Sequence, residues 1–485
     1  MSGFGILSAG AFAPRQRIAR AAIADAMSWA QPALKSAAKG VRAFAAWDED
    51  PITLGVEAAR SAVKSAPGVR ADQLCFASTT APFLDRQNAG VIAAALDLPA
   101  ETFVFETSGG QRAATSALIA AGASRERATL AVAADVRPVR AGSPLEMQAG
   151  DAGAAVLLGP GDPIAEFLGA NSVYADLVDH YRTAETGVDY VLEERWYRDV
   201  GLSRLAPSAA APLLEEAGVS AAEITHLIAP SANPSLAGAT AKALGVDRGR
   251  LADSLYDYCG HAGVAHPLLA LVETLKTARP GETVLVLGFG QGCDALLFRT
   301  TEALRDFQER APAPIADDPY RTEENYLRFL SARGAIDVDW GMRAERDNRT
   351  AHTVAFDKSR AITGFVGGRC RVCGTPQFPK SRRCVNPDCA ALDTQDDYRF
   401  ADRRATIKSY TEDWLAFTRE PPLVYGNVSF EGGGNVFMEM CDFAPGDAAV
   451  GAALAMRLRI KDVDTQRGFH RYFWNAAPAE GGAHG

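Results

Sequence analysis

The stretch 105-FETSGGQRAATSAL-118 decides the fold of the N-terminal part of this chain. Its first residues read as the end of a strand, Gly109 and Gly110 as a tight turn, and the residues after them as a helix of small side chains. Many enzymes present a nucleophile at such a turn, at the positive end of the helix dipole. Here the turn offers Ser108 and Gln111 but no cysteine, so the stretch predicts a site that lacks the usual thiol.

On both sides of this stretch the chain alternates between strand-like and helix-like segments, up to about residue 300. Short apolar runs at 129–139 and 281–289 are bounded by turn residues, which is typical of buried strands in a parallel-type sheet. The small-residue segments 89–98 and 237–246 read as helices. The alternation predicts a layered α/β fold.

The two halves of this region follow the same order of elements. From Leu74 the order is strand, polar loop, helix ending in Ala-Leu, strand, and a glycine turn at Gly109. From Leu227 the same order leads to a glycine turn at Gly260. The offset of about 150 residues is the length of one domain. We therefore predict a duplicated α/β unit with halves at about 1–160 and 161–300.

The rest of the chain differs in composition. Residues 301–357 are highly charged and predict a linker with helices, and residues 358–398 contain a cysteine cluster. In 399–476, the run 424-VYGNVSFEGGGNVFMEM-440 alternates around three glycines, which predicts a hairpin in a small β-barrel. Residues 477–485 are expected to form a flexible tail.

The cysteine cluster predicts a metal site. Cys370, Cys373, Cys384 and Cys389 follow the spacing C-x2-C-x10-C-x4-C, and two such pairs can close a tetrahedral thiolate shell around a structural zinc ion. The alternative is four reduced cysteines without metal. Residues 358–408 hold 11 Lys or Arg against 5 Asp or Glu, so this basic region is either a solvated or salt-bridged surface or a site for the phosphates of coenzyme A.

Composition narrows the class of protein. The 485 residues are 47% apolar and 22% charged, and the net charge of −9 gives no support to nucleic-acid binding. The N-terminal segment has no basic region, and Pro14 interrupts its apolar stretch, so we expect neither a signal peptide nor a membrane span and predict a cytoplasmic protein. The glycines of 288-GFGQG-292 lie between two strand-like runs, which predicts a hairpin, not a dinucleotide site.

Four motifs resemble the thiolase superfamily, especially ketoacyl synthase III and HMG-CoA synthase. They are 110-GQRAATSAL-118, 229-APSANPSLAGATAKALG-245, 259-CGHAGVAHPLLAL-271 and 284-VLVLGFGQGCDALLF-298. Residues from about 360 to 475 resemble the zinc-ribbon/OB-fold proteins that partner thiolase-like enzymes. The resemblance implies a duplicated thiolase-like fold followed by a zinc ribbon and an OB-fold, a homodimer, and carbon–carbon bond chemistry on acyl-CoA or on CoA plus a small 3-oxo substrate.

The resemblance also shows where this chain departs from the family. Gln111 stands in place of the nucleophilic cysteine, and Ala229 or Pro230 stands in place of the histidine of the second motif, while Asn233 is retained. His261 replaces the asparagine of the third motif. Thr79 and Thr80 occupy the loop that carries the glutamate base of HMG-CoA synthases. Acyl-cysteine catalysis at this helix tip is therefore not expected.

Other groups near these motifs could perform the chemistry. The predicted catalytic residues are His261, Gln111, Asn233 and Tyr258, the predicted oxyanion donors include the backbone of Phe289 and Gly290, and the predicted CoA-phosphate ligands are Arg371, Arg382 and Arg383. An unshifted imidazole titrates near neutral pH, so His261 is a candidate for proton transfer, although it could simply cap the following helix. Tyr258 could instead pack in the core, and Cys259 could be either a displaced nucleophile or an inert small hydrophobe.

Three functions remain open at this point. The first is an enzyme that makes or breaks a C–C bond beside an acyl-CoA carbonyl without an acyl-cysteine, by Claisen-type acyl transfer or its reverse. The second is a retro-aldol lyase that uses His261 or Tyr258. The third is a non-catalytic scaffold that binds a partner synthase. The first two require a polar pocket that His261 faces, and the third predicts a pocket filled by side chains.

Overall fold

The structure is a computed structural model that describes residues 3–191, 193–229, 231 and 233–479. The chain forms two compact units. The first comprises Met1–Ala46, Asp50–Gly90 and Pro99–Ala335, and the second comprises Trp47–Glu49, Val91–Leu98 and Ile336–Gly485. Among the described residues, no helix is long and apolar enough to cross a membrane.

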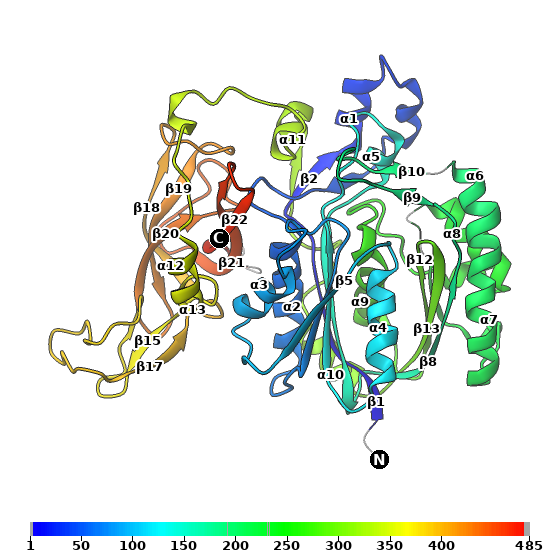
Figure 1. The fold of residues 1–485 in the computed structure, drawn as a ribbon, viewed down its shortest axis with the longest axis horizontal. Coiled ribbons are helices and arrows are strands. Elements are labelled where there is room, and N and C mark those ends of the chain that lie inside the picture. Colours follow the sequence, from blue (N-terminus) through cyan, green and yellow to red (C-terminus); the bar gives the residue numbers. More distant parts are fainter. Residues whose placement is uncertain (1–2, 192, 230, 232, 480–485) are drawn as a thin grey trace. The chain divides into compact units, whose positions relative to one another are not determined.

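The first unit is built on one nine-stranded sheet with the order β11-β12-β13-β8-β1-β7-β6-β4-β5 (Figure 1). Its strands are β1 (Gly3–Phe12), β4 (Gln73–Ala77), β5 (Phe103–Thr107), β6 (Thr129–Asp135), β7 (Ala152–Gly161), β8 (Ala165–Tyr174), β11 (His226–Ile228), β12 (Thr283–Phe289) and β13 (Gly292–Thr300). Strands β6, β12 and most of β7 are buried throughout, as their continuous apolar sequences predict.

The sheet repeats one pattern twice. In the first half β4 pairs parallel with β6, and β6–β7 and β7–β1 are antiparallel. In the second half β11 pairs parallel with β12, and β12–β13 and β13–β8 are antiparallel. The halves join where β1 pairs with β8, at Gly5–Glu166 and Ile6–Ala165. Both halves thus have the same pairing sequence, as a duplicated unit would, and the β12–β13 pairing shows that 288-GFGQG-292 forms a hairpin.

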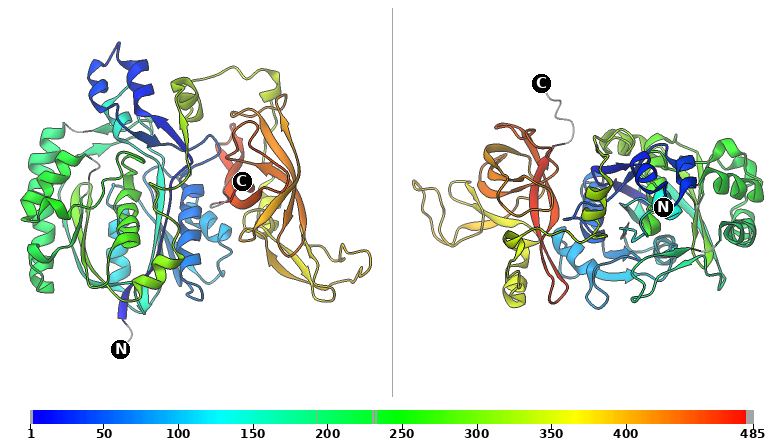
Figure 2. Two further views of the ribbon diagram at one scale, coloured as in Figure 1. Left: turned by 180° about the vertical axis from the view of Figure 1, so that it is seen from behind. Right: turned by 90° about the horizontal axis from the view of Figure 1, so that it is seen from above.

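Helices lie on both outer faces and in the middle of the first unit. Figure 1 and the rear view in Figure 2 show α4 (Ala113–Ala123) and α9 (His266–Thr277) between the two halves of the sheet. Helix α2 (Pro51–Ser65) packs on β1, β6 and β7, and α7 (Ala206–Ala217) packs on β8 and β13, beside α8 (Pro234–Leu244). The remaining helices of this unit are α1 (Arg20–Met27), α5 (Pro144–Gln148), α6 (Glu194–Trp196), α10 (Leu304–Arg310) and α11 (Tyr326–Ala332), and α3 (Asn88–Ala95) continues into the second unit.

Small residues allow the central helices to approach the sheet closely. A Cβ atom added at Gly288 in β12 would lie 2.0 Å from the Oγ1 atom of Thr115 in α4. The glycine therefore permits contact between helix and strand that no other residue could accept. This contact places the N-terminus of α4 beside the turn between β12 and β13.

The linker predicted at 301–357 is shorter than expected. The first unit continues to Ala335 because β14 (Arg321–Glu323) pairs with β2 (Gln16–Ala19), which in turn pairs with β3 (Val41–Ala43). Phe307 and Phe329 are almost completely buried. Charged residues lie on the exposed side of these short elements. The composition of the segment therefore gave no sign that its aromatic residues are buried.

The second unit contains a small sheet and a closed barrel. The sheet has the order β16-β15-β17, formed by β15 (Val366–Cys370), β16 (Pro376–Gln377) and β17 (Gln395–Arg399). The barrel order is β18-β19-β20-β22-β21, formed by β18 (Ala405–Asp413), β19 (Leu423–Phe430), β20 (Asn435–Met440), β21 (Ala453–Asp464) and β22 (Phe469–Pro478). Helices α12 (His352–Asp357) and α13 (Ser359–Ile362) precede them. The five-stranded barrel confirms the predicted β-rich region, whose last strand ends at Pro478; residues 480–485 of the predicted tail lie outside the described residues.

Candidate functional site

The two glycine turns of the duplicated fold bring distant motifs to one place. Gly109 has a φ of 92° and Gly260 a φ of 95°, a backbone conformation that glycine adopts readily. The first turn leads into α4 and the second into α9, the two helices at the centre of the unit. Gln111 and His261 follow these glycines, so both side chains lie where the central helices begin.

Gln111, His261 and Asn233 line one cavity of about 450 Å³. A second cavity of about 390 Å³ is lined by the segment after β4 and by the Gly109 turn. His180 and Asp189 line both cavities. The structure thus brings three of the four predicted catalytic side chains to one cavity, and their roles remain predictions.

Arg137 holds the Gln111 side chain. Two guanidinium nitrogens of Arg137 lie 2.7 and 3.0 Å from the Gln111 amide oxygen, once that oxygen is assigned to the side facing the donors. Because a guanidinium only donates hydrogen bonds, this orientation is the one that satisfies both groups. The amide nitrogen of Gln111 is then the group that remains to donate to a bound carbonyl.

His261 is a neutral hydrogen-bond donor in this site. Its Nδ1 atom accepts a hydrogen bond of 3.2 Å from the Gly263 backbone N–H, so the ring proton is on Nε2. Burial lowers the pKa of His261 well below its usual value, and the nearby groups His266, Arg137 and His180 lower this pKa further. The expectation of an imidazole that titrates near neutral pH is therefore wrong, because the surrounding protein disfavours the charged ring.

Asn233 uses its amide oxygen to cap α8. The Asn233 Oδ1 atom accepts from the Ser235 backbone N–H at 2.9 Å, as helix N-cap residues commonly do. Its amide nitrogen is the group left for a ligand in the cavity. The neighbouring Pro230, named above as a possible replacement for the family histidine, lies outside the described residues.

Tyr258 and Cys259 lie outside both cavities. The Tyr258 hydroxyl donates to Asp253 Oδ2 at 3.1 Å, and burial raises its pKa. Cys259 is fully buried, and burial raises the pKa of its thiol to about 11. The structure therefore does not bring Tyr258 to the site, and it favours the inert interpretation of Cys259 over a displaced nucleophile.

The predicted oxyanion donors of the glycine hairpin are also placed elsewhere. The Gly290 N–H donates to the Gly292 carbonyl at 3.1 Å, and the Gly290 carbonyl accepts from Arg112 Nε at 3.0 Å. The Phe289 ring packs against Tyr197 at a centroid distance of 4.9 Å. Neither residue lines either of the two cavities described above. The predicted role of Gly290 is wrong because the hairpin turn itself uses its N–H.

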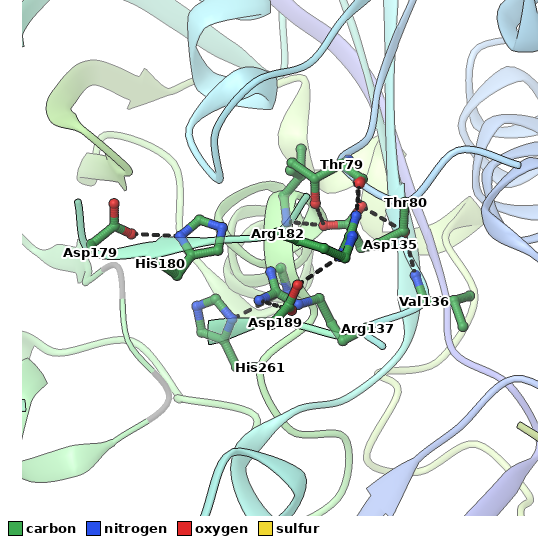
Figure 3. A network of polar contacts seen from close by, with 12 residues as sticks. Thr79, Thr80, Asp135, Val136, Arg137, Asp179, His180, Arg182, Asp189 and His261 are labelled. Carbon is green, nitrogen blue, oxygen red and sulfur yellow. Dashed lines mark hydrogen bonds and ion pairs between the residues drawn. The ribbon is translucent and has the colours of Figure 1, made fainter. Parts of the chain in front are cut away.

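Sequence reasoning missed a short hairpin that carries several polar residues of the site. Strands β9 (His180–Tyr181) and β10 (Tyr190–Val191) pair with each other. Asp189 forms ion pairs with Arg137 at 2.5 Å and Arg182 at 2.6 Å, and Arg182 also donates to the Thr79 carbonyl (Figure 3). A strand of two residues is too short to show a periodic pattern, so the sequence predicted no element here. The closely spaced polar residues of 179-DHYR-182 were the feature that could have indicated part of the site.

Asp135 organises the loop that contains Thr79 and Thr80. Its carboxylate accepts hydrogen bonds from the Thr79 hydroxyl at 2.9 Å and the Thr80 hydroxyl at 3.0 Å (Figure 3). It also accepts from the backbone N–H of Thr79 and of Val264, both within 2.9 Å. This buried carboxylate therefore connects the loop to the segment before α9 through its hydrogen bonds. Thr79 and Thr80 thus bind a fixed carboxylate and supply no base.

The four cysteines of the second unit form a compact cluster. All four Sγ atoms lie within 4.8 Å of one another, and the Cys370–Cys389 and Cys373–Cys384 distances are 3.9 and 3.5 Å. Thiolates bound tetrahedrally at 2.3 Å from zinc would be about 3.8 Å apart. The cluster therefore fits the predicted metal.

Two arginines of the basic region are already paired. Arg382 forms two hydrogen bonds of 2.8 Å with Asp393, and Arg371 contacts Asp396 at 2.6 Å. Arg383 is exposed. Arg371 and Arg382 therefore form part of a salt-bridged surface.

Comparison with known proteins was consistent with this fold. The family model of the 3-oxoacyl-[acyl-carrier-protein] synthase III C terminal matches residues 214–299. The hydroxymethylglutaryl-CoA synthase of Thermococcus sibiricus is 28% identical over 343 residues, which cover 67% of this chain and 93% of that protein. The enzyme of the same name from Aeropyrum pernix is 28% identical over 357 residues, covering 70% and 96%.

Solved structures resemble the chain over a similar extent. The 3-oxoacyl-(acyl carrier protein) synthase III of Pseudomonas aeruginosa PAO1 superposes with a TM-score of 0.55 and 20% identity, covering 62% of this chain and 99% of that chain. MvaS in complex with 3-hydroxy-3-methylglutaryl coenzyme A has a TM-score of 0.55 and 16% identity, covering 64% and 87%. The first unit therefore has the thiolase-like fold, and the sequence of the chain is similar to acyltransferases of that superfamily.

Proposed function

We propose that the first unit is a thiolase-superfamily acyltransferase that makes or breaks a carbon–carbon bond beside a thioester or 3-oxo carbonyl without an acyl-cysteine intermediate. The observation that carries this proposal is the cavity lining. Gln111 occupies the tip of α4 and His261 faces the same space, while no cysteine lines either cavity in the described part of the chain. The cavity would bind the reacting carbonyl through neutral donors.

The proposed donors suit an enolate or a tetrahedral oxyanion. The Gln111 amide nitrogen, the His261 Nε2–H group and the Asn233 amide nitrogen are uncharged and can donate without first losing or gaining a proton. Donors fixed in a site of low polarity stabilise developing negative charge more than water does. A thioester carbonyl placed among them would become more acidic at its α-carbon and more open to attack.

The open cavity supports an enzyme over a scaffold. A scaffold without catalysis would have no need for an open space at the motif residues, whereas about 450 Å³ is open beside His261. A retro-aldol lyase that used Tyr258 gains no support, because that hydroxyl is bonded to Asp253 outside the cavity. A lyase that used His261 would share the same cavity and differ only in its substrate.

Acyl-CoA is the substrate class that we propose. The curated relatives are hydroxymethylglutaryl-CoA synthases, and structures of similar fold were solved with coenzyme A or 3-hydroxy-3-methylglutaryl coenzyme A. For the second unit we propose one structural zinc ion bound by the four clustered cysteines, and an OB-fold identity for the barrel. A homodimer is proposed for the whole chain. Among the three arginines of the basic region, a contact with CoA phosphates is proposed only for Arg383.

The test combines turnover with intact-mass measurement. The protein is incubated with a panel of acyl-CoAs and 3-oxo acids, and products and protein masses are recorded. We expect product from the wild-type chain with no acyl adduct. The Gln111→Cys variant should gain an acyl adduct from acetyl-CoA, because it places a thiol at the helix tip, and Gln111→Ser is its matched control. An acyl-cysteine on the wild-type chain, or no turnover with any member of the panel, would contradict the proposal.

A further inference from the structure

The two histidines of the cavity have opposite hydrogen-bonding states. His261 accepts at Nδ1 from the Gly263 N–H and therefore carries its proton on Nε2. His180 has its Nδ1 atom 2.8 Å from Asp179 Oδ2. An ionised carboxylate only accepts hydrogen bonds, so in the neutral imidazole Nδ1 of His180 carries the proton and Nε2 keeps its lone pair. One ring is thus a donor at Nε2, and the other is a base at Nε2.

The Asp179 carboxylate is held in place on both sides. Asp179 is 4% exposed, and its Oδ1 atom accepts from the Gln291 backbone N–H at 3.2 Å. Gln291 lies in the turn between β12 and β13, so this contact ties Asp179 to the rigid hairpin. Its second oxygen faces His180. A carboxylate fixed in this way sets the tautomer and the direction of the imidazole ring.

The hairpin that carries His180 is itself fastened to two loops of the site. Asp189, on the segment before β10, forms ion pairs with Arg137 and Arg182 (Figure 3). Its backbone N–H donates a hydrogen bond to the Pro138 carbonyl at 2.9 Å. These contacts connect the hairpin to the loop that follows β6. His180 is therefore presented by a backbone with fixed partners.

His180 lies where the two cavities meet. It lines both of them, and its side chain keeps 12% of its surface exposed. It is near enough to His261 to contribute to the lowering of that residue's pKa. Figure 3 shows the His180 ring paired with Asp179 and the His261 ring near it. A ligand bound in either cavity can therefore contact His180.

We propose that His180, oriented by Asp179, is the general base of this site; this inference rests on the proposed function. In the condensing direction the Nε2 lone pair of His180 takes a proton from the α-carbon of the acyl thioester. The C–H electron pair forms the C=C bond of the enolate as the carbonyl π pair moves to the thioester oxygen, where His261 and Gln111 donate hydrogen bonds. The α-carbon then attacks the carbonyl of a second acyl-CoA, the C–S bond of that thioester breaks, and the departing CoA thiolate takes the proton from His180. In the cleaving direction a CoA thiol gives its proton to His180 and its thiolate attacks the 3-oxo carbonyl; the C–C bond breaks, and the departing enolate takes the proton from His180 at its α-carbon.

A purely structural role for the pair makes a different prediction. If Asp179 and His180 only close the hairpin, their replacement should weaken ligand binding or stability, and added base should restore nothing. If His180 is the base, its loss should slow proton removal while acetyl-CoA still binds. Exchange of the α-proton with solvent measures this step separately from carbon–carbon bond formation.

The experiment follows deuterium uptake by acetyl-CoA in D₂O with the full-length protein. Wild-type protein should catalyse exchange, and His180→Gln should lower the exchange rate by about 10²–10⁴-fold. His180→Ala should regain part of the rate when imidazole is added, because the small base can occupy the space left in the cavity. His226→Gln is the matched control: His226 also contacts a carboxylate, that of Glu282 at 2.7 Å, but lines neither cavity.

The outcomes separate the two proposals. Wild-type exchange rates in His180→Gln, or a loss that imidazole does not restore and that accompanies loss of acetyl-CoA binding, would overturn the role of His180 and leave the proposed function standing. A wild-type chain that neither exchanges the α-proton nor converts any member of the substrate panel would instead remove the proposed function itself. Slow exchange with acetyl-CoA binding retained and rate restored by imidazole supports the base.

Discussion

At the scale of single residues, the partner of one ring nitrogen decides what a histidine can do. His261 and His180 line the same cavity, yet a backbone N–H faces Nδ1 of the first and a carboxylate faces Nδ1 of the second. The first becomes a neutral donor and the second a base. The same residue type therefore has two chemical functions in one site.

Removal of the His261 donor should slow the reaction. His261→Ala deletes the Nε2–H group that would stabilise the developing oxyanion, and the loss of one such donor typically lowers kcat by about 10²–10³-fold. His261→Gln keeps an N–H donor and should recover part of the rate. Steady-state kinetics with the productive acyl-CoA measures both. Full activity of His261→Ala would show that the carbonyl is held elsewhere.

The buried His266 should make the first unit less stable in mild acid. Its ring stacks on His261 at 4.2 Å, and burial lowers its pKa to about 4 from the usual 6.5. A depressed histidine pKa gives stability that is present above pH 6.5 and is lost as the pH falls toward 4. Linkage then predicts a loss of about 2 kcal/mol in unfolding free energy between pH 7 and pH 5 from His266.

Urea unfolding at pH 7 and pH 5 tests this prediction, with His266→Leu as the variant that cannot titrate. The variant should lose less stability than the wild-type chain over this range. His261 also has a lowered pKa, so some dependence on pH should remain in the variant. An equal loss in both proteins would show that other groups cause the acid sensitivity.

At the scale of elements, one buried carboxylate joins α4 to the strands behind it. Asp294 in β13 is fully buried and accepts from Arg112 at 2.6 Å, Thr115 at 2.8 Å and Ser116 at 2.7 Å. It also accepts from the hydroxyl of Ser172 in β8 at 2.7 Å. The N-terminus of the helix that presents Gln111 is thus fixed by side chains from two strands.

Asp294→Ala should destabilise the first unit strongly. The change leaves the Arg112 charge without its partner and removes the acceptor of the Ser116 and Ser172 hydroxyls, and breaking a buried ion pair typically costs about 3–5 kcal/mol. The unfolding free energy from urea titration measures the effect. Asp306→Ala on the exposed side of α10 is the matched control and should stay within about 0.5 kcal/mol of the wild-type value. Similar values for the two variants would contradict the structural role of Asp294.

At the scale of the whole molecule, the cysteine cluster predicts one metal ion for each chain. Four thiolates within 4.8 Å of one another can close a single tetrahedral site. Metal analysis of freshly purified, reduced protein should find about one zinc per chain, and Cys373→Ser should lower that content. Cys441→Ser, outside the cluster, should retain the metal. Protein without zinc would leave four reduced cysteines as the correct interpretation.

The edge of the nine-stranded sheet predicts self-association. Strand β5 is terminal in the sheet, Phe103 on it is 56% exposed, and its ring stacks on Phe105 at 5.4 Å. An exposed apolar edge strand favours pairing with another chain. Light scattering at micromolar concentration should show a dimer, and Phe103→Glu should shift the protein toward monomer. A monomeric wild-type chain would refute the predicted dimer.

The sequence alone was enough to predict the repeated α/β architecture. Buried strands such as 129–135 are continuous apolar runs, and the glycines at 109 and 260 mark turns that few other residues could form. The glycine hairpin, the five-stranded barrel and the convergence of the four cysteines also follow from patterns within short segments. Such features are set by local sequence because side-chain periodicity and turn geometry act over a few residues.

Only the tertiary structure decided the chemistry of the site. Cys259 and Tyr258 follow one another directly before the Gly260 turn, but burial and a contact with Asp253 remove them from the cavity. The state of His261 depends on its surroundings in the fold, and His180 enters the site on a hairpin too short to be predicted. Tautomers, pKa values and cavities arise from groups that are distant in the chain and close in space. Segment patterns therefore predict the framework of this protein, while long-range contacts determine which side chains can react.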